Sequence, residues 1–275
     1  MIHNVPQAPV TVVLTRPKGK NERLQQRFEQ MGLPTISLPA LTLRRLTIAD
    51  PLPELSVFDL VFFVSGFAVD CFFDLLSEKG MHWPADLHAG CVGPGTAQAL
   101  QRRGVCKDHI YLPSDGQSFD SPGLMASLHS NGVLATLHSV LIACGTTGNP
   151  WFADRLRERA ISVTRISLYE RQGRQWDVQE RQQMGQLFEN PSIKKYVVIT
   201  SPQGVAAFVG NLALSGVDAN VLADTTTFVL THASQVSSLQ QIWGREIHGA
   251  NVSALHIVQT LPDDDAIFHT VTISD

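Results

Sequence analysis

The amino-acid sequence predicts an α/β protein whose parallel sheets are covered by helices on both faces. Three observations lead to this prediction. Short apolar runs recur along the chain, each run ends in small or polar residues, and a segment with apolar residues at helical spacing follows. Runs that are apolar throughout are typical of strands buried on both faces of a parallel sheet. The length of 275 residues suits two domains of ordinary size.

Six strand–turn–helix units follow one another along the sequence. In each unit Gly, Ser, Thr or Pro separates the apolar run from the helical segment. The first three units are Val12–Thr15 before a helix around Leu24 and Phe28, Leu60–Val64 before a helix around Val69 and Phe72, and Gly90–Val92 before a helix around Ala97 and Leu100. The other three are Val140–Ala143 before Phe152 and Leu156, Tyr196–Thr200 before Val205 and Phe208, and Phe228–Leu230 before Val236 and Leu239.

The units also match one another over long distances, which indicates an internal duplication, with chance similarity as the alternative. A duplication would give two similar α/β domains. The matching pairs are Val61 with Val197, Ser65 with Ser201, Val69 with Val205, Phe72 with Phe208, Thr96 with Ser234, Leu24 with Phe152, and Phe28 with Leu156.

Two segments, 41–46 and 165–171, combine β-forming residues with charges and do not lead into a helix in the usual way. Each is expected to be an exposed strand that connects domains, and the alternative is an edge strand of one sheet. The residues from Pro262 onward are expected to form a polar tail.

Composition excludes several classes of protein. Lys and Arg number 21 against 25 Asp and Glu, a net charge of −4, which argues against a general nucleic-acid binder. No apolar run approaches the ~18 residues that span a bilayer, and no signal peptide is recognised at the start. The four cysteines lack Cys-x-x-Cys spacing, as expected of incidental thiols in a reducing compartment. We therefore expect a cytoplasmic monomer.

Several common sites are absent from the sequence. It contains no phosphate-binding P-loop, no Gly-x-Ser-x-Gly elbow and no His-Glu-x-x-His motif. The segment from Gly93 to Gln98 begins like a dinucleotide fingerprint, but Gln98 stands where the third Gly belongs. The ten histidines are scattered without the spacing of metal ligands, so no metal site is predicted.

Polar turns at predicted helix starts are the most frequent candidate binding feature. The first N–H groups of a helix lack intrahelical partners and carry partial positive charge, so they bind carboxylates or phosphates. Several such turns facing a cleft between two domains would favour a polyanionic ligand. The alternative is that the turn residues only cap their helices. These residues are Ser65, Thr96, Ser201 and Ser234.

Tyr169 is the best side-chain candidate for chemistry, because a phenol can donate a proton to a leaving hydroxyl. A packed strand tyrosine is the alternative. Arg165 and Arg171 flank Tyr169. These two and four further arginines would bind carboxylates through charge-assisted hydrogen bonds, unless they are only solvated. They are Arg16, Arg44, Arg45, Arg165, Arg171 and Arg174.

The order of short motifs along about residues 11–260 resembles the uroporphyrinogen-III synthase family. The motifs are Leu14-Thr15-Arg16-Pro17, the segments 63–69 and 92–97, Gly145-Thr146-Thr147-Gly148, Leu168-Tyr169-Glu170-Arg171, and Thr200-Ser201-Pro202-Gln203-Gly204. The resemblance implies two flavodoxin-like three-layer domains with parallel sheets, joined by a two-stranded β-ladder. Domain one would combine residues 1–40 and 174–275, domain two would be 50–163, and 41–49 and 164–173 would be the linker strands.

The resemblance also implies an activity in haem biosynthesis: a lyase that cyclises the linear tetrapyrrole hydroxymethylbilane, with inversion of ring D and loss of water. No metal or organic cofactor is implied. A transient hand-over of substrate from hydroxymethylbilane synthase is expected, and neither nucleic acid nor membrane is. Tyr169 matches the family's tyrosine that assists loss of the hydroxyl. The implied substrate-binding residues are Arg16, Ser65, Gly66, Gly95, Thr96, Gly145, Thr146, Arg171, Ser201, Gln203, Gly204, Thr231 and His232.

Three turns depart from the family pattern. Phe67 replaces an amide residue, Cys144 and Asn149 replace two arginines, and Thr231-His232 stands where Gly is frequent. Backbone N–H contacts survive such changes, whereas side-chain contacts do not. A catalytically impaired homologue that binds a tetrapyrrole or another polyanion is therefore the alternative function, and a two-lobed ligand receptor is a third.

Overall fold

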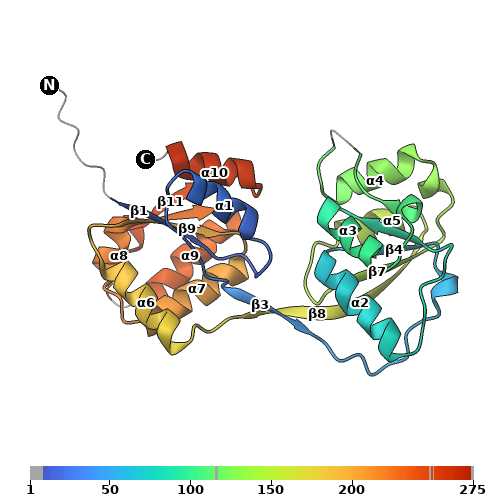
Figure 1. Cartoon of the computed structure of the whole chain (residues 1–275), viewed down its shortest axis with the longest axis horizontal. Helices are drawn as coiled ribbons and strands as arrows, with labels where there is room; N and C mark the ends of the chain where they lie inside the picture. Colours follow the sequence, from blue (N-terminus) through green and yellow to red (C-terminus); the bar gives the residue numbers. More distant parts are fainter. Residues whose placement is uncertain (1–8, 115–116, 248, 250, 274–275) are drawn as a thin grey trace. The chain divides into compact units, whose positions relative to one another are not determined.

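The computed structural model describes residues 9–114, 117–247, 249 and 251–273. The chain forms two compact units: unit 1 extends to Thr42 and resumes at Gln172, and unit 2 extends from Leu43 to Arg171. Each unit contains a largely parallel sheet whose strands alternate with helices, so the predicted α/β class is confirmed (Figure 1). In the described part of the chain, no helix is long and apolar enough to cross a membrane.

The sheet of unit 1 has five parallel strands in the order β11-β10-β9-β1-β2. The strands are β1 (Val10–Leu14), β2 (Thr35–Ser37), β9 (Lys194–Ile199), β10 (Thr226–Leu230) and β11 (His256–Gln259). The helices are α1 (Glu22–Gln30), α6 (Val178–Glu189), α7 (Pro202–Leu214), α8 (Ala219–Thr225), α9 (Ala233–Glu246) and α10 (Asp264–Ile273), with a 3-10 turn at Val252–Ala254.

Two apolar layers bury this sheet, because successive side chains of a strand point to opposite faces. In β9, Val197 packs in the layer with α6, α7 and α9, whereas Val198 packs in the layer with α1 and α10. Figure 1 shows α1 (blue) beside α10 (red) across the sheet from α7 and α9. The expected polar tail is wrong, since α10 buries Ile267 and Val271 completely.

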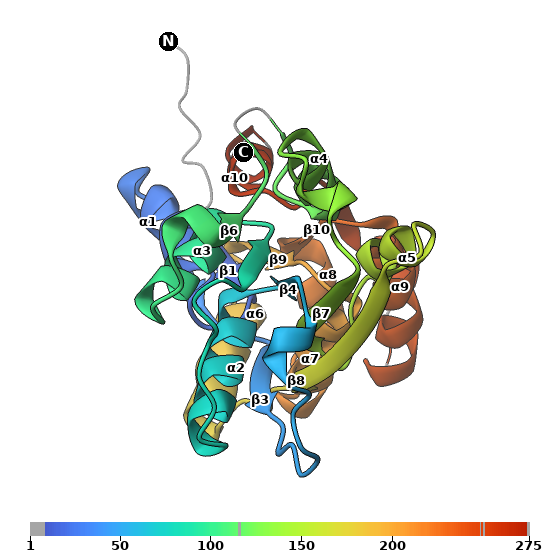
Figure 2. The same cartoon turned by 90° about the vertical axis from the view of Figure 1, so that its right-hand side faces the viewer.

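The sheet of unit 2 has six strands in the order β3-β8-β7-β4-β5-β6. The strands are β3 (Leu41–Arg45), β4 (Leu60–Phe63), β5 (His88–Cys91), β6 (Ile110–Tyr111), β7 (Ser139–Gly145) and β8 (Ser162–Gly173). The helices are α2 (Gly66–Glu78), α3 (Pro94–Arg102), α4 (Ser121–Ser130) and α5 (Trp151–Arg157), with 3-10 turns at Leu55–Val57, Lys107–His109 and Val133–Ala135. Figure 2 shows α2 and α3 on one face and α4 and α5 on the other.

The two charged segments without helices form neighbouring strands, β3 and β8. Leu46 N–H donates to Leu168 O at 2.9 Å and Arg174 N–H donates to Ala40 O at 2.8 Å, so the two strands run in opposite directions. β3 is the edge strand of its sheet, as the alternative for segment 41–46 predicted. The division between the units falls inside both strands.

The two sheets repeat one strand order. β9 and β4 are central, β10-β11 and β5-β6 continue on one side, and β1-β2 and β7-β8 on the other. Val12 pairs with Tyr196 as Val140 pairs with Leu60, which agrees with the matched sequence pairs. The match of Thr96 with Ser234 is wrong by one residue. Thr96 is the third residue after its N-cap Gly93, but Ser234 is the second after its N-cap His232.

Candidate active site

A cavity of about 530 Å³ lies at the carboxyl ends of the parallel strands of unit 2. Ligands of open α/β sheets usually bind at this edge, where the helix N-termini also gather. The lining comes from the turns after β4 and β7, the start of α4, and one side of β8. The lining residues that matter for chemistry are Ser65, Cys144, Trp151, Arg165, Tyr169 and Arg171.

Tyr169 presents a nearly buried ring to this cavity, with 4% of the residue exposed. The ring of Phe67 packs edge-on against it with centroids 5.1 Å apart. On another side a Cβ at Gly145 would lie 3.0 Å from Tyr169 Cε2, so a residue without a side chain is needed there. A bulge at Cys144/Gly145 shifts the pairing of β7 with β8 at this point. The surroundings therefore fix the ring.

The Tyr169 hydroxyl lies 3.3 Å from Ser65 Oγ, within hydrogen-bond distance. Ser65 is the N-cap of α2, and its Oγ accepts the Ala68 N–H at 3.2 Å. Ser65 is thus both the predicted N-cap and a neighbour of the candidate acid. Either hydroxyl can donate in this contact, which keeps the phenol oxygen in place as proton transfer requires.

Arg165 and Arg171 line the cavity from β8. Arg165 Nη2 is 3.6 Å from Cys144 Sγ, and neither arginine forms an ion pair with a described residue. Arg44 and Arg45 are different, because they pair with Glu170 and Glu78. The cavity therefore holds cationic groups without carboxylate partners.

The other predicted residues of unit 2 lie beside the cavity and outside its lining. Thr146 N–H donates to Tyr169 O at 2.9 Å, which holds the turn after β7 against β8. Gly66 and Gly95 come close at the starts of α2 and α3, where a Cβ on Gly66 would lie 3.9 Å from Gly95 O. Thr96 is nearly buried in the first turn of α3. Their substrate contacts stay predictions.

The predicted residues of unit 1 cap helices after β9 and β10. Ser201 Oγ accepts the Gly204 N–H at 3.1 Å, and Gln203 is exposed in the same turn. The Thr231 N–H donates to Gln235 Oε1 at 2.7 Å. His232 Nδ1 accepts the Ser234 N–H at 3.1 Å, so this histidine is an N-cap. Their contacts with substrate also stay predictions.

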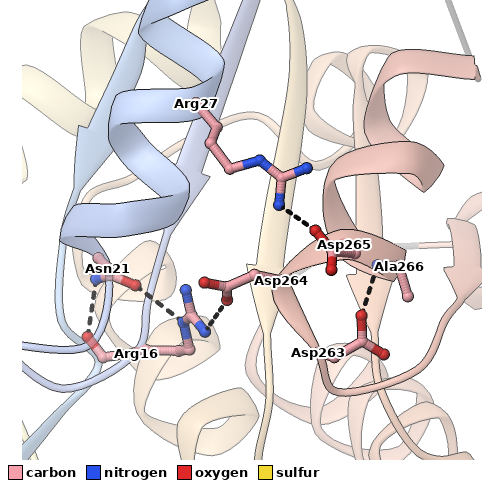
Figure 3. A network of polar contacts seen from close by, with 7 residues as sticks. All are labelled: Arg16, Asn21, Arg27, Asp263, Asp264, Asp265 and Ala266. Atoms are coloured by element: carbon pink, nitrogen blue, oxygen red, sulfur yellow. Dashed lines mark hydrogen bonds and ion pairs between the residues drawn. The ribbon is translucent and has the colours of Figure 1, made fainter. Parts of the chain in front are cut away.

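In unit 1 the Arg16 side chain binds other residues of the protein. Its Nη1 forms an ion pair with Asp264 Oδ1 at 2.7 Å and its Nε donates to Asn21 Oδ1 at 3.2 Å (Figure 3). Only 15% of the side chain is exposed. A substrate carboxylate would have to displace Asp264, so the predicted binding role of Arg16 requires a second contact or a rearrangement.

The described residues contain no cluster of metal ligands, and two of their thiols are held protonated by burial. No group of three or more His, Cys, Asp and Glu side chains in them is placed to hold a metal ion. Burial raises the pKa of the Cys71 and Cys91 thiols to about 11, which keeps them protonated near neutral pH. Cys71, Cys91 and Cys144 are buried as expected, whereas Cys106 is exposed.

Sequence reasoning missed the wall of the cavity opposite Tyr169. Trp151 at the start of α5 and Ser121 at the start of α4 both line it. Asp120 caps α4 by accepting the Gly123 N–H at 2.8 Å. The segment Asp120-Ser121-Pro122 carries the usual marks of a helix start, which could have indicated this turn.

The fold and the site define an α/β protein with a cavity at the carboxyl ends of parallel strands, lined by a tyrosine and unpaired arginines. A family model described as uroporphyrinogen-III synthase HemD matches residues 22–235, more than three quarters of the chain. The chain belongs to this family.

Known relatives agree with this membership. A curated uroporphyrinogen-III synthase of Salmonella typhimurium is 27% identical over 172 residues, which cover 61% of this chain and 68% of the relative. The solved uroporphyrinogen-III synthetase of Helicobacter pylori is 16% identical, with a TM-score of 0.56 over 96% of this chain and 98% of that one. It shows a shared fold. A synthase variant of Thermus thermophilus aligns with a TM-score of 0.47 and 14% identity, covering 96% and 97% of the two chains.

Proposed function

We propose that this chain is a uroporphyrinogen-III synthase that cyclises hydroxymethylbilane, inverts ring D and releases water in haem biosynthesis. Family membership indicates an enzyme of tetrapyrrole synthesis. The observation that carries the proposal is Tyr169, which lines the cavity and whose hydroxyl lies 3.3 Å from Ser65 Oγ. The lyase reaction and its independence of cofactors are part of the proposal.

In the proposed reaction Tyr169 is the catalytic acid. Its hydroxyl donates a proton to the ring-D hydroxyl of the substrate, the carbon–oxygen bond breaks, and water leaves an electrophilic azafulvene. Ring D is inverted through a spiro-pyrrolenine intermediate before the macrocycle closes. The phenolate recovers a proton when the last pyrrole regains its aromaticity, so the enzyme ends unchanged. Ser65, which holds the phenol, is a positioning residue.

Most of the rate enhancement would come from folding the linear substrate into a reactive conformation. We propose that its carboxylates contact Arg171 and the helix starts of both units. Arg171 lines the cavity without an ion pair to a described residue. The contacting residues would be Arg16, Ser65, Gly66, Gly95, Thr96, Gly145, Thr146, Ser201, Gln203, Gly204, Thr231 and His232.

We further propose that the two units are flavodoxin-like domains. Residues 1–40 and 174–275 would form domain one, 50–163 domain two, and 41–49 with 164–173 the linker ladder. The strand order of unit 1, numbered along its own chain, is 2-1-3-4-5, which supports a flavodoxin-like sheet. A monomer in the cytoplasm that receives substrate from hydroxymethylbilane synthase stays a prediction.

A coupled assay tests the function. Porphobilinogen and hydroxymethylbilane synthase generate the substrate, the protein is added, and the products are oxidised and separated by isomer. We expect mainly the type III isomer, because the unassisted reaction closes the ring without inversion. Only the type I isomer with intact folded protein would contradict the synthase function and favour the alternative, a polyanion-binding homologue.

A further inference from the structure

The repeated strand order gives two residues of the cavity in unit 2, Cys144 and Ser121, a counterpart in unit 1. Because Val12 and Val140 occupy the same place in their sheets, Arg16 corresponds to Cys144. The starts of α10 and α4 correspond as well. Asp263 accepts the Ala266 N–H at 2.8 Å, and Asp120 accepts the Gly123 N–H at the same distance. The next residue in each helix is Asp264 in unit 1 and Ser121 in unit 2.

In unit 1 an ion pair fills this place. The Arg16 guanidinium lies 2.7 Å from the Asp264 carboxylate, and Asn21 supports it from the start of α1 (Figure 3). In unit 2 both charges are absent from the equivalent positions, because Cys144 and Ser121 stand there. Both residues line the cavity.

A guanidinium reaches this cavity from another strand. Arg165 extends from β8, and its Nη2 is 3.6 Å from the thiol that replaces Arg16. No described carboxylate forms an ion pair with it. Trp151 adds an aromatic wall, with the Arg155 guanidinium 5.9 Å from its ring centroid. Relative to unit 1, the cavity has a cation and an aromatic surface but no carboxylate at the position of Asp264. The carboxylate that does line it, Asp120, accepts the Gly123 N–H at 2.8 Å as the cap of α4.

We propose that the cavity of unit 2 binds a carboxylate-bearing aromatic ring, and that Arg165 pairs with its carboxylate in the position that Asp264 takes in unit 1. This inference rests on the proposed function for the source of the ring, one carboxylated pyrrole of the linear tetrapyrrole. Arg165 would then supply the side-chain charge that the turn after β7 lacks, since Cys144 and Asn149 stand where relatives are expected to have arginines.

Binding of uroporphyrin III, a stable porphyrin with eight carboxylates, tests the role of Arg165. Quenching of tryptophan fluorescence reports the dissociation constant. We expect Arg165→Gln to weaken binding about tenfold, because a hydrogen bond between charged groups is lost. Arg165→Lys should recover part of this loss. The control Arg102→Gln removes the same charge from an exposed position of unit 2 outside the cavity, and should change binding less than about twofold.

A second variant rebuilds the ion pair of unit 1. Ser121→Asp places a carboxylate in the first turn of α4, where the helix dipole favours it, so the fold is kept. We expect it to pair with Arg165 and to weaken uroporphyrin binding about tenfold. Ser130→Asp, at the far end of α4, is the matched control. In the Arg165→Gln background Ser121→Asp should add little, because the two changes act on one contact. Unchanged binding in Arg165→Gln, or fully additive effects, would overturn the proposal.

The coupled assay separates this inference from the proposed function. Formation of the type III isomer with an unchanged KM in Arg165→Gln would overturn the carboxylate site and leave the synthase function standing. Porphyrin binding that depends on Arg165, without any type III isomer from the wild-type chain, would support the site and contradict the synthase function.

Discussion

Units 1 and 2 share one strand order, yet the same position holds an ion pair in one and lines a cavity in the other. In unit 1 the Arg16–Asp264 ion pair fills the edge between β1 and α10. In unit 2 the equivalent residues are Cys144 and Ser121, and a cavity of about 530 Å³ remains. One framework thus carries an ion pair within the protein at one strand end and two small uncharged residues in a cavity wall at the equivalent strand end.

The two units also differ at a second pair of equivalent positions, near the amino ends of the central strands β4 and β9. Asp59 precedes β4, and its carboxylate accepts the His138 and Ser139 N–H groups at 2.7 and 2.8 Å. Lys195 stands at the corresponding place in β9, fully buried, and its ammonium donates to Asn190 O and Thr225 Oγ1. The same position can therefore hold either charge, because the carboxylate has N–H donors beside it and the ammonium has oxygen acceptors.

The largest effect is expected when the candidate proton donor of unit 2 is removed. Tyr169→Phe should lower kcat roughly a hundredfold with little change in KM, because only the proton donor is removed. Steady-state kinetics in the coupled assay measure both constants. Tyr111→Phe, in β6 of the same unit, is the control and should leave kcat unchanged. A change confined to KM would remove Tyr169 from the acid role.

The next largest effect is expected when the Arg16–Asp264 ion pair of unit 1 is removed. Asp264→Asn should lower the free energy of unfolding by roughly 2 kcal/mol, since it leaves the mostly buried Arg16 guanidinium without its charged partner. Urea unfolding measures it. Asp265→Asn removes an ion pair in which the carboxylate is 78% exposed, and should cost less than about 0.5 kcal/mol. Equal costs for the two variants would contradict the structural role of Asp264.

A smaller effect tests how tightly unit 2 holds its tyrosine. Gly145→Ala places a Cβ 3.0 Å from the Tyr169 ring and should destabilise the protein by about 1–2 kcal/mol while lowering kcat. Gly148→Ala lies in the same turn with nothing within 4 Å of its added Cβ, and should be close to neutral. Thermal unfolding and turnover of the two variants are compared. Identical behaviour would show that the ring is free to move.

The smallest effect, about 1 kcal/mol between pH 8 and 9, concerns the buried lysine of unit 1. Burial lowers the pKa of Lys195 from 10.5 to about 8. Above pH 8 the unfolded chain therefore binds a proton that the folded chain has lost, and the free energy of unfolding gains up to ~1.4 kcal/mol per pH unit until about pH 10.5. Below pH 8 both states are protonated and this gain is lost. Urea unfolding at pH 8 and 9 should show a shallower rise for Lys195→Met than for the exposed control Lys194→Met.

The sequence predicted those features that are determined by residues close together along the chain. The strands of the six predicted units and the N-caps Ser65 and Ser201 follow from apolar runs and turn residues, whereas β2, β6 and β11 were not predicted. The Arg16–Asp264 pair could not be predicted, because its partners are 248 residues apart and each looks like an ordinary surface charge. The cavity of unit 2 was missed for a similar reason, since Trp151 and Ser121 come together only through the packing of α4 and α5 on one face.

The assembly of unit 1 from both ends of the chain has a consequence for how the protein is made. Thr15 donates a hydrogen bond to Val198 O, 183 residues further along, and α1 packs on α10 close to the last described residue. The strands of the sheet of unit 2 lie between Leu41 and Gly173, so all of them are synthesised before β9, one of the two neighbours of β1. β1 therefore pairs with β9 only after the strands of unit 2 have been made, and such pairing over a long sequence separation is intrinsically slow.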